Sequence, residues 1–182
     1  MSRISIPTVD TSPEASKPLL AAVKQSLGVV PNLMKLVGHS PAALEGYLGL
    51  NGALNKGKLD AKLRERIALA VAEYNGCDYC LSVHDYLSRN VAKLTSVEID
   101  AARDFHAEDP HTDAALRFAR RVTESRGRVA DADLAALRAA GFDEAATVEI
   151  VITVALNILT NYVNNVAQTD IDFPKVLTKL SA

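Results

Sequence analysis

The sequence predicts an all-α, multihelical fold, because apolar residues recur with helical spacing along most of the chain and no run alternates like a strand. Pairs of helix-breaking residues separate these stretches from one another. A length of 182 residues with 48% hydrophobic content is enough to bury one core. We therefore expect a single helical domain over residues 1–182. Its expected parts are an N-terminal arm over 1–13, a motif-bearing half over about 14–105 and a degenerate second half over about 106–182.

Helix start and stop signals place eight helices along this domain. Residues 1–13 mix Pro, Ser and Thr without periodicity and predict an extended arm. The expected helices span about 14–27, 41–54, 60–74, 77–90, 96–105, 110–126, 131–139 and 144–168, and most of the breaks between them contain Gly, Pro or Asn.

The helix expected over 60–74 has little polar surface. Its apolar stripe consists of Leu63, Ile67, Ala70, Val71 and Tyr74, and Ala68, Leu69 and Ala72 make the other side nearly as apolar. Glu65 lies on this helix and needs a partner, because burial of an unpaired charge is costly. Spacing leaves two roles open for Glu65. It could form a salt bridge to Arg64, Arg66 or another helix, or it could act in catalysis. Glu73 is the alternative carboxylate.

Charge and apolar runs give no reason to expect a nucleic acid or a membrane as a partner. Twenty basic residues balance 22 acidic ones, for a net charge of −2. The longest apolar run, 150–159, is shorter than the ~20 residues that span a bilayer, so we expect it in the core. Residues 1–18 contain no run typical of a signal peptide, which predicts a cytoplasmic protein. Arg117, Arg120, Arg121, Arg126 and Arg128 alternate with acidic residues and predict a solvated or subunit-facing helix surface.

The main functional signal is a pair of cysteines separated by two residues. Cys77 and Cys80 follow the Asn75-Gly76 break and open the next helix, where backbone amides and the helix dipole favour a thiolate. His84 lies four residues after Cys80, on the same helix face, and can take the thiol proton. Cys77 is close enough to condense with a sulfenic acid on Cys80. The spacing therefore predicts a dithiol/disulfide redox centre.

Other interpretations of the cysteine pair are a zinc site and a buried, inert pair. Only three zinc ligands are local, whereas structural zinc sites draw further Cys or His from a second loop. A c-type haem would need histidine at position 81, where Leu81 stands. His39, His106 and His111 are expected on the surface. No nucleotide-binding glycine loop is present, so we expect no bound cofactor.

The pattern E-x11-C-x2-C-x3-H, from Glu65 to His84, resembles the alkylhydroperoxidase D-like and carboxymuconolactone decarboxylase superfamily. The segments Gly-Val-Val-Pro-Asn at 28–32 and Ser-Pro at 40–41 look like its peroxidase-related branch. The resemblance implies that Cys80 attacks peroxide, that Cys77 resolves the disulfide, and that Glu65 and His84 form a proton relay. Tyr79 stands where the best-known family enzymes carry histidine, which implies a shorter relay or a different partner.

The residues and the resemblance together predict a thiol-dependent peroxidase that reduces hydroperoxides and is recycled by an external dithiol or protein reductant. Three alternatives stay open. The chain could be a disulfide reductase that recycles a partner peroxidase, an enzyme like carboxymuconolactone decarboxylase, or a non-catalytic redox-responsive or zinc-binding protein.

A second copy of the motif spacing suggests duplication. Glu149, Asn161 and Asn164 repeat E-x11-C-x2-C as E-x11-N-x2-N, 84 residues later. We therefore expect residues 60–90 and 144–170 to superpose about a pseudo-two-fold, with the asparagines marking a degenerate site. In the superfamily six such units commonly pack together, so the resemblance implies a homotrimer, with a hexamer or dimer as the alternatives.

Overall fold

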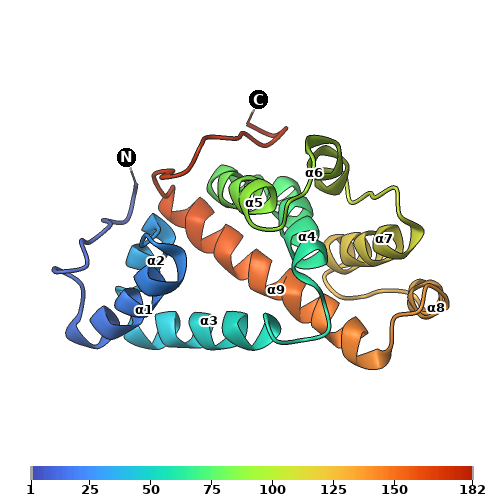
Figure 1. Ribbon diagram of the computed structural model, residues 1–182, viewed down its shortest axis with the longest axis horizontal. Helices are drawn as coiled ribbons and strands as arrows, with labels where there is room; N and C mark the ends of the chain where they lie inside the picture. The colour runs from blue at the N-terminus through green and yellow to red at the C-terminus, as the bar shows by residue number, and fades with distance from the viewer. Residues whose placement is uncertain (1, 182) are drawn as a thin grey trace.

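The computed structural model describes residues 2–181, and within them the chain forms helices joined by turns, without a strand (Figure 1). The all-α prediction is therefore confirmed. Met1 and Ala182, the ends of the predicted arm and of the predicted second half, lie outside the described residues. The elements are a short 3-10 helix (Glu14–Ser16), α1 (Lys17–Leu27), α2 (Asn32–Val37), α3 (Pro41–Leu54), α4 (Ala61–Tyr74), α5 (Asp78–Asn90), α6 (Ser96–Arg103), α7 (Pro110–Ser125), α8 (Asp131–Ala139) and α9 (Glu144–Ala167).

All eight expected helices are present, with ends that differ from prediction by a few residues at most. The first of them begins as the 3-10 turn, and α2 was not predicted. α2 has only six residues, between Pro31 and Gly38, and this is too short a stretch for helical periodicity to show in the sequence. Several starts are fixed by aspartate caps: Asp60, Asp109 and Asp143 each accept the backbone N–H three residues further on, at 2.7–2.8 Å.

Two apolar clusters share helix α4. One cluster joins α4 to α7, α8 and α9, and the other joins it to α1, α2, α3, α5 and α6. Ile67, Ala70 and Val71 belong to the first cluster, whereas Leu69 and Ala72 belong to the second. The prediction that this helix is buried on most faces is confirmed, with Tyr74 at its end as the exposed member of the stripe.

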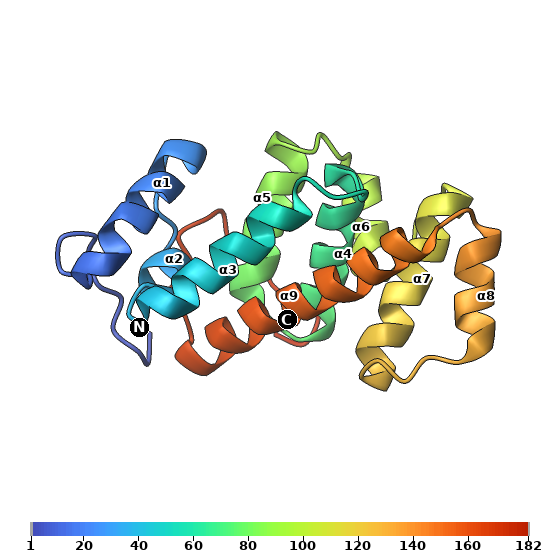
Figure 2. The same cartoon turned by 90° about the horizontal axis from the view of Figure 1, so that it is seen from below.

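Helix α9 crosses the molecule beside α3 and below α4 (Figure 2). By length and composition it is the one helix in the described chain that could cross a membrane. It also contacts α3, α4, α5 and α7, and the core helix of a globular domain passes the same test. Ile150, Val154 and Leu156 are buried, whereas Leu159 at the end of the run is 45% exposed, so the predicted core role holds for one face of the helix. The cytoplasmic location stays a prediction.

The two segments with repeated spacing differ in local structure, so the expected superposition of residues 60–90 and 144–170 is wrong. The first segment is two helices, α4 and α5, separated by a break at Asn75–Cys77 in which Gly76 has φ +62°. The second is the single uninterrupted helix α9, because Leu159 and Thr160, 84 residues after Asn75 and Gly76, are compatible with a helix. The division of the chain into two halves stays a prediction.

Candidate active site

Cys77 and Cys80 are joined in a disulfide at the N-terminus of α5, with their Cα atoms 5.3 Å apart. Both are buried, Cys77 being 0% and Cys80 3% exposed. They belong to the apolar cluster that also contains Leu69 and Leu81. The predicted pairing of the two sulfurs is therefore present, inside the protein rather than on its surface.

The start of α5 treats the two sulfurs differently. Cys77 is the N-cap residue, and its Sγ accepts the backbone N–H of Cys80 at 3.2 Å. An amide donor and the positive end of a helix both stabilise a thiolate. The first turn of this helix thus favours charge on Cys77.

Glu65 and His84 form the second half of the site. The Glu65 carboxylate accepts a hydrogen bond from His84 Nδ1 at 2.9 Å, joining α4 to α5. Each side chain is about one-fifth exposed, so the pair borders solvent while the sulfurs do not. Because a carboxylate only accepts, a neutral His84 carries its hydrogen on Nδ1 and leaves Nε2 free to take a proton.

The alternative partners for Glu65 are occupied elsewhere. Arg66 bonds Glu98 at 2.5 Å, and Arg64 donates to the Leu59 carbonyl. The alternative carboxylate, Glu73, accepts from Arg103 Nε at 2.7 Å and from the Lys179 backbone N–H at 2.6 Å. A salt bridge from Glu65 to Arg64 or Arg66 is therefore a wrong prediction. Glu73 holds the C-terminal segment through the backbone N–H of Lys179.

Asn161 and Asn164, expected at a separate degenerate site, instead complete this one. Asn164 Nδ2 donates to Cys80 Sγ at 3.2 Å. Asn161 Oδ1 accepts from Asn75 Nδ2 at 2.9 Å, which ties α9 to the loop before Cys77. The available signal was two asparagines, three residues apart, in an otherwise apolar helix, but spacing alone did not show which segment they face.

Tyr79, between the two cysteines, links α5 to other parts of the chain. Its hydroxyl accepts the Leu33 backbone N–H at 3.0 Å and donates to Asp172 Oδ1 at 2.9 Å. Burial, and then the nearby Asp172 carboxylate, raise the pKa of Tyr79 well above its ordinary value. Tyr79 therefore stays protonated and connects α5 to α2 and to the C-terminal segment.

The C-terminal segment, residues 168–181, runs back across α5 without helical structure (Figure 1). Its backbone N–H groups at Val176 and Thr178 donate to Ser82 Oγ at 3.0 Å and to Asp78 Oδ1 at 2.8 Å. These contacts fix the first turns of α5 and so the position of both cysteines.

Tyr47 of α3 lies near the site, although the sequence did not indicate it. It packs against the cluster that contains both cysteines. Burial, and then the Glu65 carboxylate, together raise the pKa of Tyr47 to about 12. Tyr47 therefore lies close enough to Glu65 for the carboxylate to act on its hydroxyl, and no local pattern around Tyr47 signals this position.

The other sequence candidates lie on the surface, as predicted. His39, His106 and His111 are exposed, and so are all five clustered arginines. Arg117 and Arg120 pair with Asp113 and Glu124 at 2.5 and 2.7 Å, which confirms an ion-paired helix surface; its solvated or subunit-facing character stays a prediction. Within residues 2–181, no group of three or more His, Cys, Asp or Glu side chains is arranged to hold a metal ion.

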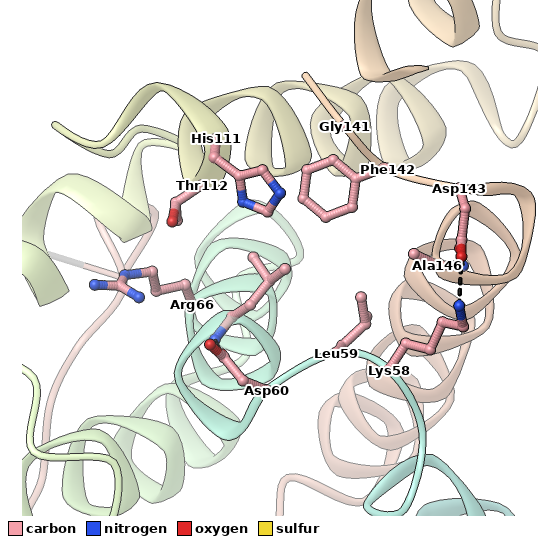
Figure 3. Close-up of a pocket in the computed structure, with 11 residues that line it drawn as sticks. Lys58, Leu59, Asp60, Arg66, His111, Thr112, Gly141, Phe142, Asp143 and Ala146 are labelled. Atoms are coloured by element: carbon pink, nitrogen blue, oxygen red, sulfur yellow. Dashed lines mark hydrogen bonds and ion pairs between the residues drawn. The ribbon is translucent and has the colours of Figure 1, made fainter. Parts of the chain in front are cut away.

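A cavity of about 260 Å³ lies away from the sulfurs, between the starts of α4, α7 and α9 (Figure 3). His111 stacks on Phe142 along one wall, with ring centroids 4.2 Å apart. Lys58 and Asp143 bond each other across another wall. None of the four predicted catalytic residues lines this cavity.

Comparison with known proteins agrees with this fold. The family model for the carboxymuconolactone decarboxylase family matches residues 41–125, which include α3, α4, α5 and both cysteines. An uncharacterized protein of Haemophilus influenzae is 43% identical over 63 residues, 34% of this chain. That match spans 50% of the relative's length.

Solved structures match over nearly the whole chain. A peroxidase-related protein of Ralstonia eutropha, described as an alkylhydroperoxidase AhpD core, has a TM-score of 0.83 and 26% identity, over 94% of this chain and 92% of its own. A peroxidase-related protein of Silicibacter sp. TM1040 has a TM-score of 0.81 and 22% identity, over 93% and 91%. The debrominase Bmp8, solved with 2,3,4-tribromopyrrole, has a TM-score of 0.74 and 22% identity, over 92% and 94%. The last two likenesses concern the fold alone.

The helical fold, the cysteine pair that opens α5 and the neighbouring Glu–His pair agree with the resemblance stated from the sequence. The family-model match and the likeness to the Ralstonia eutropha structure support a relationship to the alkylhydroperoxidase D-like and carboxymuconolactone decarboxylase superfamily, and within it to peroxidase-related proteins.

Proposed function

We propose that this protein is a thiol-dependent peroxidase that reduces hydroperoxides through the Cys77–Cys80 pair. The observation that carries the proposal is a cysteine disulfide at the start of α5, where Cys80 Sγ accepts from an amide donor. His84, on the same helix as Cys80, is held by Glu65 of α4. A carboxylate-held imidazole beside a dithiol provides a base, a nucleophile and a resolving thiol.

In the proposed cycle the reduced protein begins with His84 Nε2 taking the thiol proton of Cys80. The thiolate attacks the terminal oxygen of the hydroperoxide, the O–O bond breaks, and the alkoxide leaves with the proton from His84 as an alcohol. Sulfur is oxidised by two electrons to a sulfenic acid. The Cys77 thiolate then attacks Cys80 Sγ, the S–O bond breaks, and hydroxide leaves as water after protonation.

An external dithiol closes the cycle. Its thiolate attacks Cys80 Sγ of the disulfide and Cys77 leaves as a thiolate, which the Cys80 backbone N–H stabilises. The second thiol of the reductant then displaces Cys80, so the reductant ends as its own disulfide and the protein as a dithiol.

Burial favours this reaction over disulfide reduction on a partner peroxidase. A protein disulfide would have to reach sulfurs that are 0% and 3% exposed, whereas a hydroperoxide and a small dithiol are much smaller.

Peroxide turnover with a panel of dithiols tests the proposal. We expect the wild type to consume hydrogen peroxide or an organic hydroperoxide for many turnovers with dithiothreitol or dihydrolipoamide. Cys80→Ser should have no activity, and Cys77→Ser should stop after one turnover with a sulfenic acid on Cys80. A fully active Cys80→Ser protein would end the assignment.

We also propose that the protein forms a homo-oligomer, with the trimer favoured. The support is an apolar stripe on the outer face of α9, where Val148, Leu159, Tyr162 and Val166 are 45–65% exposed. Continuous exposed apolar surface of this kind is typical of an interface. Light scattering should give a trimer for wild type and for Val97→Glu, which alters an isolated exposed residue of α6. Val166→Glu should dissociate it, and a monomeric wild type would contradict the proposal.

A further inference from the structure

We propose that Asn164 is a catalytic residue that holds the Cys80 sulfur in two of its oxidation states. Its amide N–H donates to the Cys80 thiolate, and its amide oxygen accepts the hydroxyl of the Cys80 sulfenic acid. The inference rests on the proposed peroxidase cycle and extends it to a helix outside the C-x-x-C motif.

The need for such a residue follows from the surroundings of Cys80. Its sulfur lies in an apolar cluster and is 3% exposed, and an apolar environment disfavours a thiolate. The backbone donor at the start of α5 is directed to Cys77, since the Cys80 N–H bonds Cys77 Sγ. Asn164 Nδ2, at 3.2 Å, is the side-chain donor that the structure gives to Cys80.

The orientation of the Asn164 amide is fixed by its neighbours. Nδ2 has two hydrogens, and it donates to the Thr160 carbonyl at 3.0 Å as well as to Cys80 Sγ. A flipped amide would set its oxygen against that carbonyl oxygen, where neither atom can donate. The nitrogen therefore faces the sulfur.

The other end of the amide is unused. Asn164 is 2% exposed, and its Oδ1 is buried without a hydrogen-bond partner. A buried acceptor of this kind costs free energy unless a donor arrives during function. Neither a thiolate nor a disulfide offers a donor, whereas a sulfenic acid on Cys80 carries one O–H. One turn earlier, Asn161 Nδ2 is also buried without a partner, so this face of α9 keeps polar capacity beside the sulfurs.

Each function of the amide has a chemical consequence. Donation from Nδ2 keeps Cys80 ionised near neutral pH and ready to attack. Acceptance by Oδ1 holds the sulfenic hydroxyl on one side of the sulfur, which leaves the opposite side open to Cys77. Asn164 would thus act both in peroxide attack and in resolution.

The test uses Cys77→Ser protein, in which Cys80 is the single cysteine and serine preserves the N-cap of α5. Alkylation of Cys80 by iodoacetamide is followed against pH, with no peroxide present. We expect Asn164→Leu to move the midpoint up by about one unit and to slow alkylation at pH 7 about tenfold. Asn157→Leu is the matched control, because Asn157 is also buried on α9 and donates to its own i−4 carbonyl, at 2.9 Å. It should leave the midpoint unchanged.

A second readout follows the sulfenic acid. After one equivalent of hydrogen peroxide, trapping with dimedone should show a sulfenic acid that decays several-fold faster in Asn164→Leu than in the Asn157→Leu control. If Asn164→Leu does not fold, the Cys77→Ser protein itself serves: the side-chain NH₂ signals of Asn164 should titrate in an NMR experiment with the same midpoint as the thiolate absorbance of Cys80. Signals that do not move would overturn the proposal.

Failure of this inference and failure of the peroxidase proposal are distinguishable. Unchanged alkylation and sulfenate decay in a folded Asn164→Leu protein would overturn the role of Asn164, even if the wild type turns over peroxide. If the alkylation midpoint of Cys80 depends on Asn164 but the wild type does not turn over peroxide, the contact between Asn164 and the thiolate is established and the peroxidase proposal fails.

Discussion

Two segments of this chain share one spacing and do different things. Glu65, Cys77 and Cys80 occur in α4 and α5, and Glu149, Asn161 and Asn164 occur in α9. Glu65 accepts from His84, whereas Glu149 accepts the backbone N–H groups of Lys58 and Leu59 at 2.7 and 3.2 Å. The first carboxylate is thus part of a candidate proton relay, and the second holds the loop before α4.

The difference comes from the helix break. Gly76, with φ +62°, lies in the break after α4 and lets α5 begin with the backbone N–H of Cys80 donating to Cys77 Sγ. Helix α9 has no break, so its asparagines lie inside a continuous helix and project from one face toward Cys80. The two equally spaced segments therefore contribute to one candidate site rather than to two similar ones.

The largest expected effect on the rates comes from His84, which has no counterpart in the second segment. His84→Ala removes the base and should slow both peroxide reduction and alkylation of Cys80 at neutral pH by about 10²-fold. The remote, exposed His111→Ala is the control and should change neither rate. Unchanged alkylation of Cys80 across pH in His84→Ala would make His84 structural.

The two carboxylates should separate activity from stability. Glu65→Ala leaves His84 without its hydrogen-bond partner, so the peroxidase rate should fall about tenfold while the unfolding free energy changes little. Glu149→Ala leaves two backbone N–H groups without their acceptor and should cost about 1–3 kcal/mol of stability with the rate per folded molecule preserved. Urea unfolding and peroxide turnover measure the two effects. Equal losses of activity in both variants would remove the distinction between the segments.

How far sequence predicted this site depends on the range of each contact. The positions of Cys77, Cys80 and His84 on one helix follow from local spacing, and so does the helix break before them. Spacing alone left the partner of Glu65 open, because His84 lies 19 residues away on another helix, whereas the family resemblance implied this pair. Tyr47, Asn164 and Asp172 reach the site from α3, α9 and the C-terminal segment respectively, and no local pattern encodes such distant packing. Likewise the helices were predicted almost completely, but not the six-residue α2.

The break itself can be tested with a pair of glycines. Gly76→Ala forces a side chain into positive φ and against Leu180 at 3.2 Å, so it should destabilise the protein by about 1–2 kcal/mol. Gly46→Ala lies inside α3, where an added Cβ meets nothing within 4 Å, and should stabilise it by about 0.5–1 kcal/mol. Thermal and urea unfolding would show the opposite signs. A neutral Gly76→Ala would mean that the loop does not need this backbone conformation.

The smallest expected effect at neutral pH is that of Tyr47, which acts only in alkaline solution. A pKa raised from its unfolded value near 10 to about 12 means that the folded protein holds a proton which the unfolded chain loses. The associated stability is fully present below pH 10 and is lost as pH rises through 12. Tyr47→Phe should therefore reduce the alkaline loss of stability, by about 3 kcal/mol at most. Identical stability profiles for both proteins between pH 9 and 12 would show that Tyr47 titrates normally.

The central claim is that peroxide is reduced by the two cysteines of this site and by no other group. Its most direct test is a single-turnover measurement on the fully reduced protein, mixed with a limiting amount of hydroperoxide in the absence of a reductant. We predict that each peroxide consumed removes two thiols and forms one Cys77–Cys80 disulfide, detected by thiol titration and by peptide mapping. Consumption of peroxide without loss of thiols, or no consumption at all, would contradict the account.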